Sequence, residues 1–194
     1  MKNRKTNFAC VIIGGSAGAL IAISQILEHL NSKFKLPIII VQHLNSDTDY
    51  YFIEHYKNLA QRDVVLVDNM ADIKDGSIYV APADYHLLVE NKRLLVLSND
   101  EKVRYSRPSI DVSFESASEV FTDSLLSIIL TGANDDGALG SECVSKYGGY
   151  TIAQDPTEAQ FDEMPKRAIE TGYIDEILTI NQIIEFLNNI SMGV

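Results

Sequence analysis

Two kinds of segment alternate along the chain. Short continuous apolar runs bounded by turn residues are typical of buried parallel strands, and apolar residues at every third or fourth position are typical of amphipathic helices. The alternation predicts an α/β fold of three layers, doubly wound, with helices on both faces of a mostly parallel sheet. The predicted strands cover residues 8–13, 38–41, 63–67, 125–130 and 150–154, and the predicted helices cover residues 16–30, 51–60, 111–121, 139–147, 164–171 and 182–188.

The middle of the chain has a different pattern. Three short β-type runs, at residues 77–81, 85–89 and 93–97, are separated only by turn-forming residues such as Pro82 and Asp84. Closely spaced runs of this kind predict antiparallel hairpins. We therefore expect a short antiparallel meander inserted into the parallel sheet.

Several predicted helices have recognisable ends. Ser109 can cap the helix over residues 111–121, and the polar residues 45–49 can cap the helix at 51–60. The pair Gly148 and Gly149 closes one helix and Gly172 closes another, as glycine does at helix C-termini.

Bulk properties exclude several classes of function. With 194 residues and 46% hydrophobic content, the chain is expected to form a single domain over residues 1–194. Its 16 basic and 27 acidic residues give a net charge of -11 without a basic cluster, which argues against a nucleic-acid partner. No apolar stretch reaches the roughly 20 residues that span a bilayer. Two cysteines, Cys10 and Cys143, are expected to be buried, unpaired thiols of a cytoplasmic protein.

Three loops carry candidate chemistry, because ligands of such sheets bind beyond the carboxyl ends of the strands. GGSAG at 14–18 follows the first strand, QHLNSD at 42–47 the second, and TGANDDG at 131–137 the strand at 125–130. If these strands are neighbours, Ser16, His43 and either Asp135 or Asp136 share one site. A serine hydroxyl needs a base, and a carboxylate on the other imidazole nitrogen fixes the tautomer.

Each of these residues also has an ordinary structural explanation. Ser16 can be a helix cap, His43 a structural residue at a strand end, and the acidic pair a cap of the next helix. The glycine-rich turn also resembles a dinucleotide-binding loop. Against that alternative, Ile13 stands where the first glycine of that motif is needed, and the second predicted strand ends without the acidic residue that binds a ribose.

The motifs together resemble the catalytic domain of the chemotaxis protein-glutamate methylesterases, which also deamidate receptor glutamines. The similarity extends from about residue 8 to residue 187. It rests on GGSAG at 14–18, VQH at 41–43, LTGANDDG at 130–137, YVAPADYHLLV at 79–89, RPSIDVSF at 107–114, QDP at 154–156 and MPKRAI at 164–169.

The resemblance implies roles for individual residues. Ser16 takes the place of the nucleophile, His43 that of the base, and Asp136, directly before a glycine, that of the orienting carboxylate. Two departures concern the surroundings of the triad. The family commonly has Met-Gly where this chain has Ala133 and Asn134, and often Thr in place of Ala17.

The resemblance also implies hydrolysis of glutamyl methyl esters on a methylated chemoreceptor or similar signalling protein, with no cofactor. Members usually carry an N-terminal receiver domain, and here only residues 1–7 precede the first predicted strand. We therefore expect activity without phosphorylation control, or control by a separate regulatory protein. The alternative is a catalytically weak or silent domain of this fold that acts as an interaction module.

Other polar residues have weaker claims. Arg107, in RPSIDV, is expected to pair either with a substrate or with a structural carboxylate. His86 is expected to be structural or solvent-facing, and His29 and His55 fall inside predicted helices away from the loops. The histidines and cysteines never fall at ligand spacings, so no metal site is expected.

Overall fold

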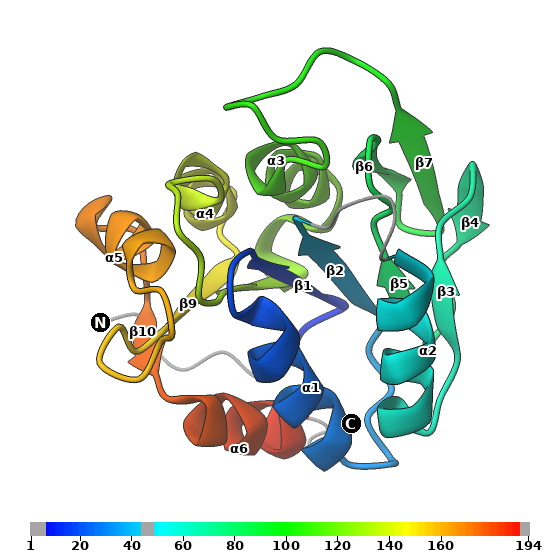
Figure 1. Ribbon diagram of the computed structural model, residues 1–194, viewed down its shortest axis with the longest axis horizontal. Helices are drawn as coiled ribbons and strands as arrows, with labels where there is room; N and C mark the ends of the chain where they lie inside the picture. Colours follow the sequence, from blue (N-terminus) through cyan, green and yellow to red (C-terminus); the bar gives the residue numbers. More distant parts are fainter. Residues whose placement is uncertain (1–6, 44–48, 191–194) are drawn as a thin grey trace.

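The main sheet has seven parallel strands in the order β10-β9-β8-β1-β2-β5-β3 (Figure 1). The computed structural model of the chain describes residues 7–43 and 49–190. The strands of this sheet are β1 (Cys10–Gly15), β2 (Ile38–Gln42), β3 (Val64–Leu66), β5 (Ile78–Val80), β8 (Leu125–Ile129), β9 (Tyr150–Gln154) and β10 (Glu176–Leu178). The central strands β1, β2, β8 and β9 are buried along their whole length, as the continuous apolar runs predict.

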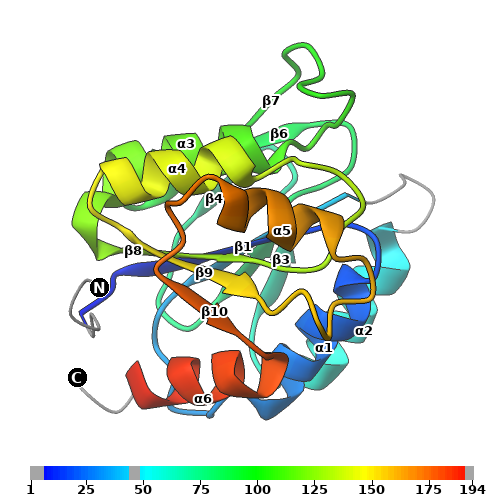
Figure 2. The same cartoon turned by 90° about the vertical axis from the view of Figure 1, so that its left-hand side faces the viewer.

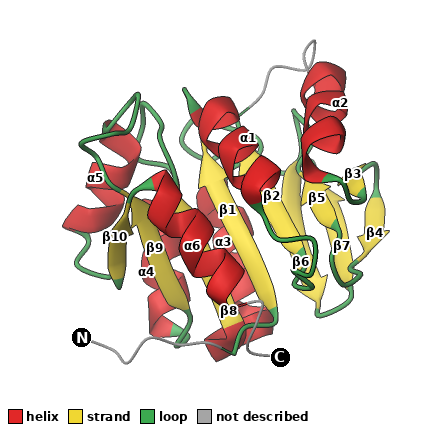
Figure 3. Ribbon diagram, turned by 90° about the horizontal axis from the view of Figure 1, so that it is seen from below, coloured by secondary structure: helices red, strands yellow, loops and turns green. Residues whose placement is uncertain are grey.

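Helices cover both faces of this sheet (Figures 2 and 3). One face packs against α1 (Ala19–His29), α2 (Asp49–Ala60) and α6 (Ile180–Ile190), through residues such as Ile23, Tyr56 and Ile183. The other face packs against α3 (Ile110–Phe121), α4 (Ala138–Lys146) and α5 (Glu163–Glu170), through Phe114 and Val144 among others. A single 3₁₀ turn, η1 (Thr122–Ser124), joins α3 to β8. The predicted α/β fold with helices on both faces is confirmed.

A second sheet of three antiparallel strands has the order β4-β7-β6, formed by β4 (Met70–Asp72), β6 (His86–Asn91) and β7 (Leu94–Ser98). The meander therefore exists, but the prediction that residues 77–81 belong to it is wrong. Those residues form β5, which pairs in parallel with β2 and β3 and is buried at all three positions. Burial on both faces is typical of an internal parallel strand. The short distance from this run to the next one favoured an antiparallel hairpin in the sequence analysis and so led to the wrong prediction.

The helix ends agree with most of the predictions. Ser109 is the N-cap of α3, and its hydroxyl accepts a hydrogen bond from the Val112 amide at 3.5 Å. Gly148 and Gly149 donate to carbonyls of the last turn of α4, which closes that helix as predicted. The predicted cap at 45–49 falls largely on residues 45–48, which lie outside the described residues. Among the helices that are described, none is long and apolar enough to cross a membrane.

The chain adds strands first on one side of β1 and later on its other side. From β1 the chain proceeds to β2 on one side through α1, while β8 lies on the other side and leads to β9 through α4. The connections after β1 and β8 therefore run to opposite faces of the sheet, and doubly wound sheets bind ligands at the edge between two such connections. The neighbourhood of β8, β1 and β2, on which the predicted site depended, is confirmed.

Candidate active site

Ser16 lies on a tight turn between β1 and α1. The predicted helix start at residue 16 is wrong, because Gly18 takes a left-handed conformation (φ 79°) and α1 begins only at Ala19. The Ser16 amide donates to the Thr131 carbonyl at 3.0 Å, which ties the turn to the loop after β8. The half-buried side chain is thereby held above the sheet edge instead of in the first turn of the helix.

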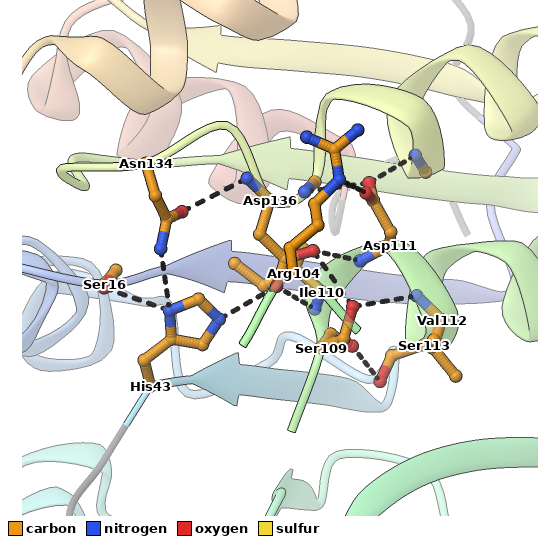
Figure 4. A network of polar contacts seen from close by, with 12 residues as sticks. Ser16, His43, Arg104, Ser109, Ile110, Asp111, Val112, Ser113, Asn134 and Asp136 are labelled. Carbon is orange, nitrogen blue, oxygen red and sulfur yellow. Dashed lines mark hydrogen bonds and ion pairs between the residues drawn. The ribbon is translucent and has the colours of Figure 1, made fainter. Parts of the chain in front are cut away.

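His43 directly follows β2, and its amide donates to the Gly15 carbonyl at 3.3 Å. Its side chain is 16% exposed and lies between Ser16 and Asp136 (Figure 4). The Ser16 Oγ atom is 3.1 Å from Nδ1 of the ring, and the Asp136 Oδ2 atom is 2.9 Å from Nε2. The three predicted residues are therefore brought together in hydrogen-bond order.

Asp136 is fully buried at the N-terminus of α3. Its Oδ1 atom accepts hydrogen bonds from the Ser109 hydroxyl (3.0 Å) and the Asp111 amide (2.9 Å), and its Oδ2 atom accepts one from the Ile110 amide (2.8 Å). Burial alone would raise the pKa of this carboxyl, but the hydrogen bonds from His43 and from the two helix amides lower it below its ordinary value. Asp136 is therefore an ionised carboxylate beside the imidazole.

The proton positions follow from this arrangement. An ionised carboxylate only accepts, so Nε2 of a neutral His43 carries the ring proton and donates it to Asp136. Nδ1 is then unprotonated and accepts the hydrogen bond from the Ser16 hydroxyl. This is the tautomer in which the ring can take a proton from the serine.

Two glycines allow α3 to approach the sheet edge this closely. A Cβ atom on Gly14 would lie 2.5 Å from Ile110 Cγ2 of α3, and one on Gly137 would lie 2.8 Å from the same atom. Gly137 also has φ of 95°, in the left-handed region that favours glycine. The glycines of the two motifs thus reflect close packing around the site.

The sequence analysis did not identify Asp111 and Arg104, two charged residues that lie behind Asp136. Asp111 Oδ1 accepts hydrogen bonds from the amides of Gly137 (2.8 Å) and Gly140 (2.7 Å), which hold the start of α4. Burial, reinforced by the charge of Asp136, raises the pKa of Asp111 to about 6. Arg104 lies 3.4 Å from Asp111 Oδ2 and also pairs with Asp135. Asp135, the alternative orienter, therefore points to Arg104 and not to His43.

Asn134 also contacts the histidine. Its Oδ1 atom accepts a hydrogen bond from the Asp136 amide at 3.1 Å, and its Nδ2 atom lies 3.4 Å from Nδ1 of His43. Its neighbour Ala133 is exposed. Of the two departures in this loop, only the one at position 134 reaches the candidate triad.

The remaining predicted candidates lie outside this group. Arg107 donates to the carbonyls of Asn99 and Asp100, and within residues 7–43 and 49–190 no carboxylate pairs with it. His86 is buried, accepts a hydrogen bond from the Ser109 amide and contacts the Glu101 carbonyl, so it is structural and not solvent-facing. His29 contacts its own helix at the Gln25 carbonyl, and His55 contacts Ser24.

The two cysteines are free, but only one of them is fully buried as predicted. Cys10 is buried in β1, whereas Cys143 on α4 is half-buried. In the part of the chain that the structure describes, no cluster of three histidine, cysteine, aspartate or glutamate side chains could hold a metal ion.

Comparison with known proteins identifies a family and several relatives of this chain. A family model described as CheB methylesterase matches residues 11–187 of the chain. A relative from Leptospira interrogans is 41% identical over 179 residues, which cover 92% of this chain and 93% of that protein. The protein-glutamate methylesterase/protein-glutamine glutaminase of Halobacterium salinarum is 36% identical over 90% of this chain, and the chain spans about half (52%) of its length.

A solved structure is similar throughout. The crystal structure of the Thermotoga maritima CheB methylesterase catalytic domain superposes with a TM-score of 0.89 at 30% sequence identity. The similarity covers 94% of this chain and 98% of that one, so the fold agrees over nearly the whole length of both.

Proposed function

This chain belongs to the CheB methylesterase family, and from that premise we propose that it is a serine hydrolase that removes methyl groups from glutamyl methyl esters of chemoreceptor-like proteins. Ser16 is the nucleophile, His43 the base and Asp136 the orienting carboxylate. The observation that carries this proposal is the hydrogen-bond series from Ser16 Oγ through both ring nitrogens of His43 to the buried, ionised Asp136.

The proposed reaction has two steps. Ser16 Oγ attacks the γ-carbonyl carbon while Nδ1 of His43 takes the hydroxyl proton, and Asp136 stabilises the resulting imidazolium. The proton then passes to the methoxy oxygen as the carbon–oxygen bond breaks, which releases methanol and leaves an acyl group on Ser16. Water hydrolyses this acyl-enzyme, again with His43 as the base. The Ala17 amide, directly after the nucleophile, is the proposed donor to the oxyanion.

The same site supports a second substrate. Several relatives carry names that join methylesterase with protein-glutamine glutaminase. Attack of Ser16 on a glutamine side chain gives the same acyl-enzyme and releases ammonia, so one triad serves both reactions. We propose methylated receptors in the cytoplasm as the natural substrates, a single catalytic domain as the unit that acts on them, and control by a separate protein.

Ser16→Ala provides the test. Wild-type protein is expected to release methanol from a peptide with a γ-glutamyl methyl ester, and the variant to lose at least about 10⁴-fold in kcat/KM. Ser24→Ala is the matched control, because Ser24 is a half-buried serine of α1 whose hydroxyl contacts His55 of α2 and not His43. Equal rates for wild type and Ser16→Ala would reject the triad. A wild type without any turnover would favour the interaction module.

A further inference from the structure

The side-chain amide of Asn134 has a defined orientation beside His43 (Figure 4). A backbone N–H can only donate, so the Asn134 atom that faces the Asp136 amide at 3.1 Å must be the oxygen. The NH₂ group therefore faces Nδ1 of His43, at 3.4 Å. Asn134 and the Ser16 hydroxyl are thus two donors that share one acceptor.

This arrangement changes during the proposed reaction. Once Nδ1 has taken the proton of Ser16 it carries a hydrogen and no longer accepts a hydrogen bond, so the Asn134 amide has lost its partner. Nδ1 must also lie within hydrogen-bond reach of the leaving-group atom, since it returns the proton there. The Asn134 NH₂ group, 3.4 Å from Nδ1, therefore borders the space of the leaving group.

We propose that Asn134 is a specificity-determining residue that donates a hydrogen bond to the leaving-group oxygen of a methyl ester and so favours esters over glutamine side chains. The inference rests on the proposed function of the Ser16 site. A methoxy oxygen has two lone pairs, so it accepts the proton of His43 on one and the hydrogen bond of Asn134 on the other. Methanol leaves as the carbon–oxygen bond breaks.

A glutamine side chain fits this donor poorly. In the tetrahedral intermediate the leaving nitrogen has one lone pair, which takes the proton from His43 as the carbon–nitrogen bond breaks and ammonia forms. Its remaining N–H groups are donors and face the donating NH₂ group of Asn134. Two donors that face each other without an acceptor leave a hydrogen bond unmade. The free-energy cost of the unpaired donor is about as large as the contribution of a well-formed hydrogen bond.

The test uses three peptides that differ at one side chain: a γ-glutamyl methyl ester, the corresponding methyl thioester, and glutamine. Sulfur accepts hydrogen bonds weakly, so the thioester reports acylation without the contribution of Asn134. Asn134→Ala is expected to lower kcat/KM for the ester about tenfold and to leave the thioester within about twofold. Because both rates come from one preparation, a change in folded fraction cancels in their ratio.

Asn134→Asp is the second variant. One carboxylate oxygen can keep the hydrogen bond from the Asp136 amide, while the other presents an acceptor in place of the donor. The ratio of ammonia release to methanol release is expected to rise about tenfold or more. The matched control is Asn91→Ala, because Asn91 Oδ1 likewise accepts from the amide two residues further on, Arg93 N at 2.9 Å, in a hairpin turn. Its ester-to-thioester ratio is expected to equal that of the wild type.

Several results would overturn the assignment. Equal losses for ester and thioester in Asn134→Ala would show a merely structural role, and so would an ammonia-to-methanol ratio that fails to rise in Asn134→Asp. In either case Ser16→Ala still abolishes turnover, and the proposed function stands. A wild type that hydrolyses none of the peptides would reject the proposed function and the role of Asn134 together.

Discussion

Two buried aspartates, Asp136 and Asp111, lie beside each other at the start of α3 and have opposite electrostatic behaviour. Each accepts hydrogen bonds from two backbone amides. The pKa of Asp136 is nevertheless lowered, whereas burial and the charge of its neighbour raise the pKa of Asp111 to about 6. Burial and backbone amides are common to both, so they cannot be the cause of the difference.

The difference comes from the other partners. Asp136 also accepts a hydrogen bond from His43, and this bond, added to those from the two helix amides, outweighs its desolvation and lowers its pKa. At its second oxygen Asp111 has Arg104, which is one-third exposed and 3.4 Å away. One carboxylate is thus prepared to stabilise a charged histidine, while the other holds the amides of Gly137 and Gly140 and keeps the Asp136 loop in place.

The largest effect is expected from Asp136→Asn. An asparagine has one acceptor oxygen where the carboxylate has two. With that oxygen in the place of Oδ1, where it keeps the bonds from Ser109 and the Asp111 amide, the NH₂ group faces both Nε2 of His43 and the Ile110 amide. The ring then carries its proton on Nδ1 and cannot accept the proton of Ser16. We expect kcat/KM for the methyl ester to fall about 10⁴-fold. A loss of less than tenfold would show that Asp136 does not orient the base.

A pH-dependent effect is expected from Asp111→Asn. The folded protein binds the Asp111 proton more tightly than the unfolded chain, whose pKa is near 3.8. The contribution of Asp111 to stability is therefore complete below that value and is lost as the pH rises through about 6. The loss amounts to about 3 kcal/mol in the free energy of unfolding.

Chemical denaturation between about pH 4 and about pH 7 measures this loss. The asparagine introduced by Asp111→Asn can keep the Oδ1 bonds to Gly137 and Gly140, so the variant is expected to lack that part of the pH dependence. Asp136 has the opposite sign, because its stabilisation exists above its ordinary pKa and is lost as the pH falls below it. If the free energy of unfolding depends on pH in the same way in wild type and Asp111→Asn, the two aspartates do not differ as described.

The smallest effect is expected from Arg104→Gln. Arg104 pairs with Asp111 and with the half-exposed Asp135, and such solvent-screened pairs contribute about 0.5 kcal/mol. We expect kcat/KM to stay within about threefold of the wild type. Without the nearby cation the pKa of Asp111 is expected to rise, so the loss of stability that follows its ionisation moves to higher pH. A large loss of activity would indicate that Arg104 acts on the substrate itself.

The sequence predicted the proximity of the three proposed triad residues better than the contacts that support them. Ser16, His43 and Asp136 each follow a buried strand, and the carboxyl ends of neighbouring strands share one edge, so their proximity could be inferred from the order of apolar runs. Asp111 and Arg104 belong to the first turn of a helix and to an irregular loop, where no periodic pattern places a side chain. The spacing from Ser109 to Asp111, at a predicted helix start, was the available signal.

The fold was predicted least well where strands are short. The strand β5 looked like part of the meander because its three residues carry too little pattern to separate a parallel from an antiparallel partner. The strands β4 and β10, also of three residues each, include exposed positions and gave no continuous apolar run. The partners of such short strands are decided by tertiary packing and not by local sequence.

Covalent labelling of the nucleophile tests the central claim most directly. A fluorophosphonate probe reacts with a serine only when a neighbouring base activates it. Intact-mass and peptide mass spectrometry are expected to show one adduct on Ser16 in the wild type, and none in Ser16→Ala or His43→Ala. An adduct on another residue, or an unlabelled Ser16 in a preparation that releases methanol, would contradict the assignment of the triad.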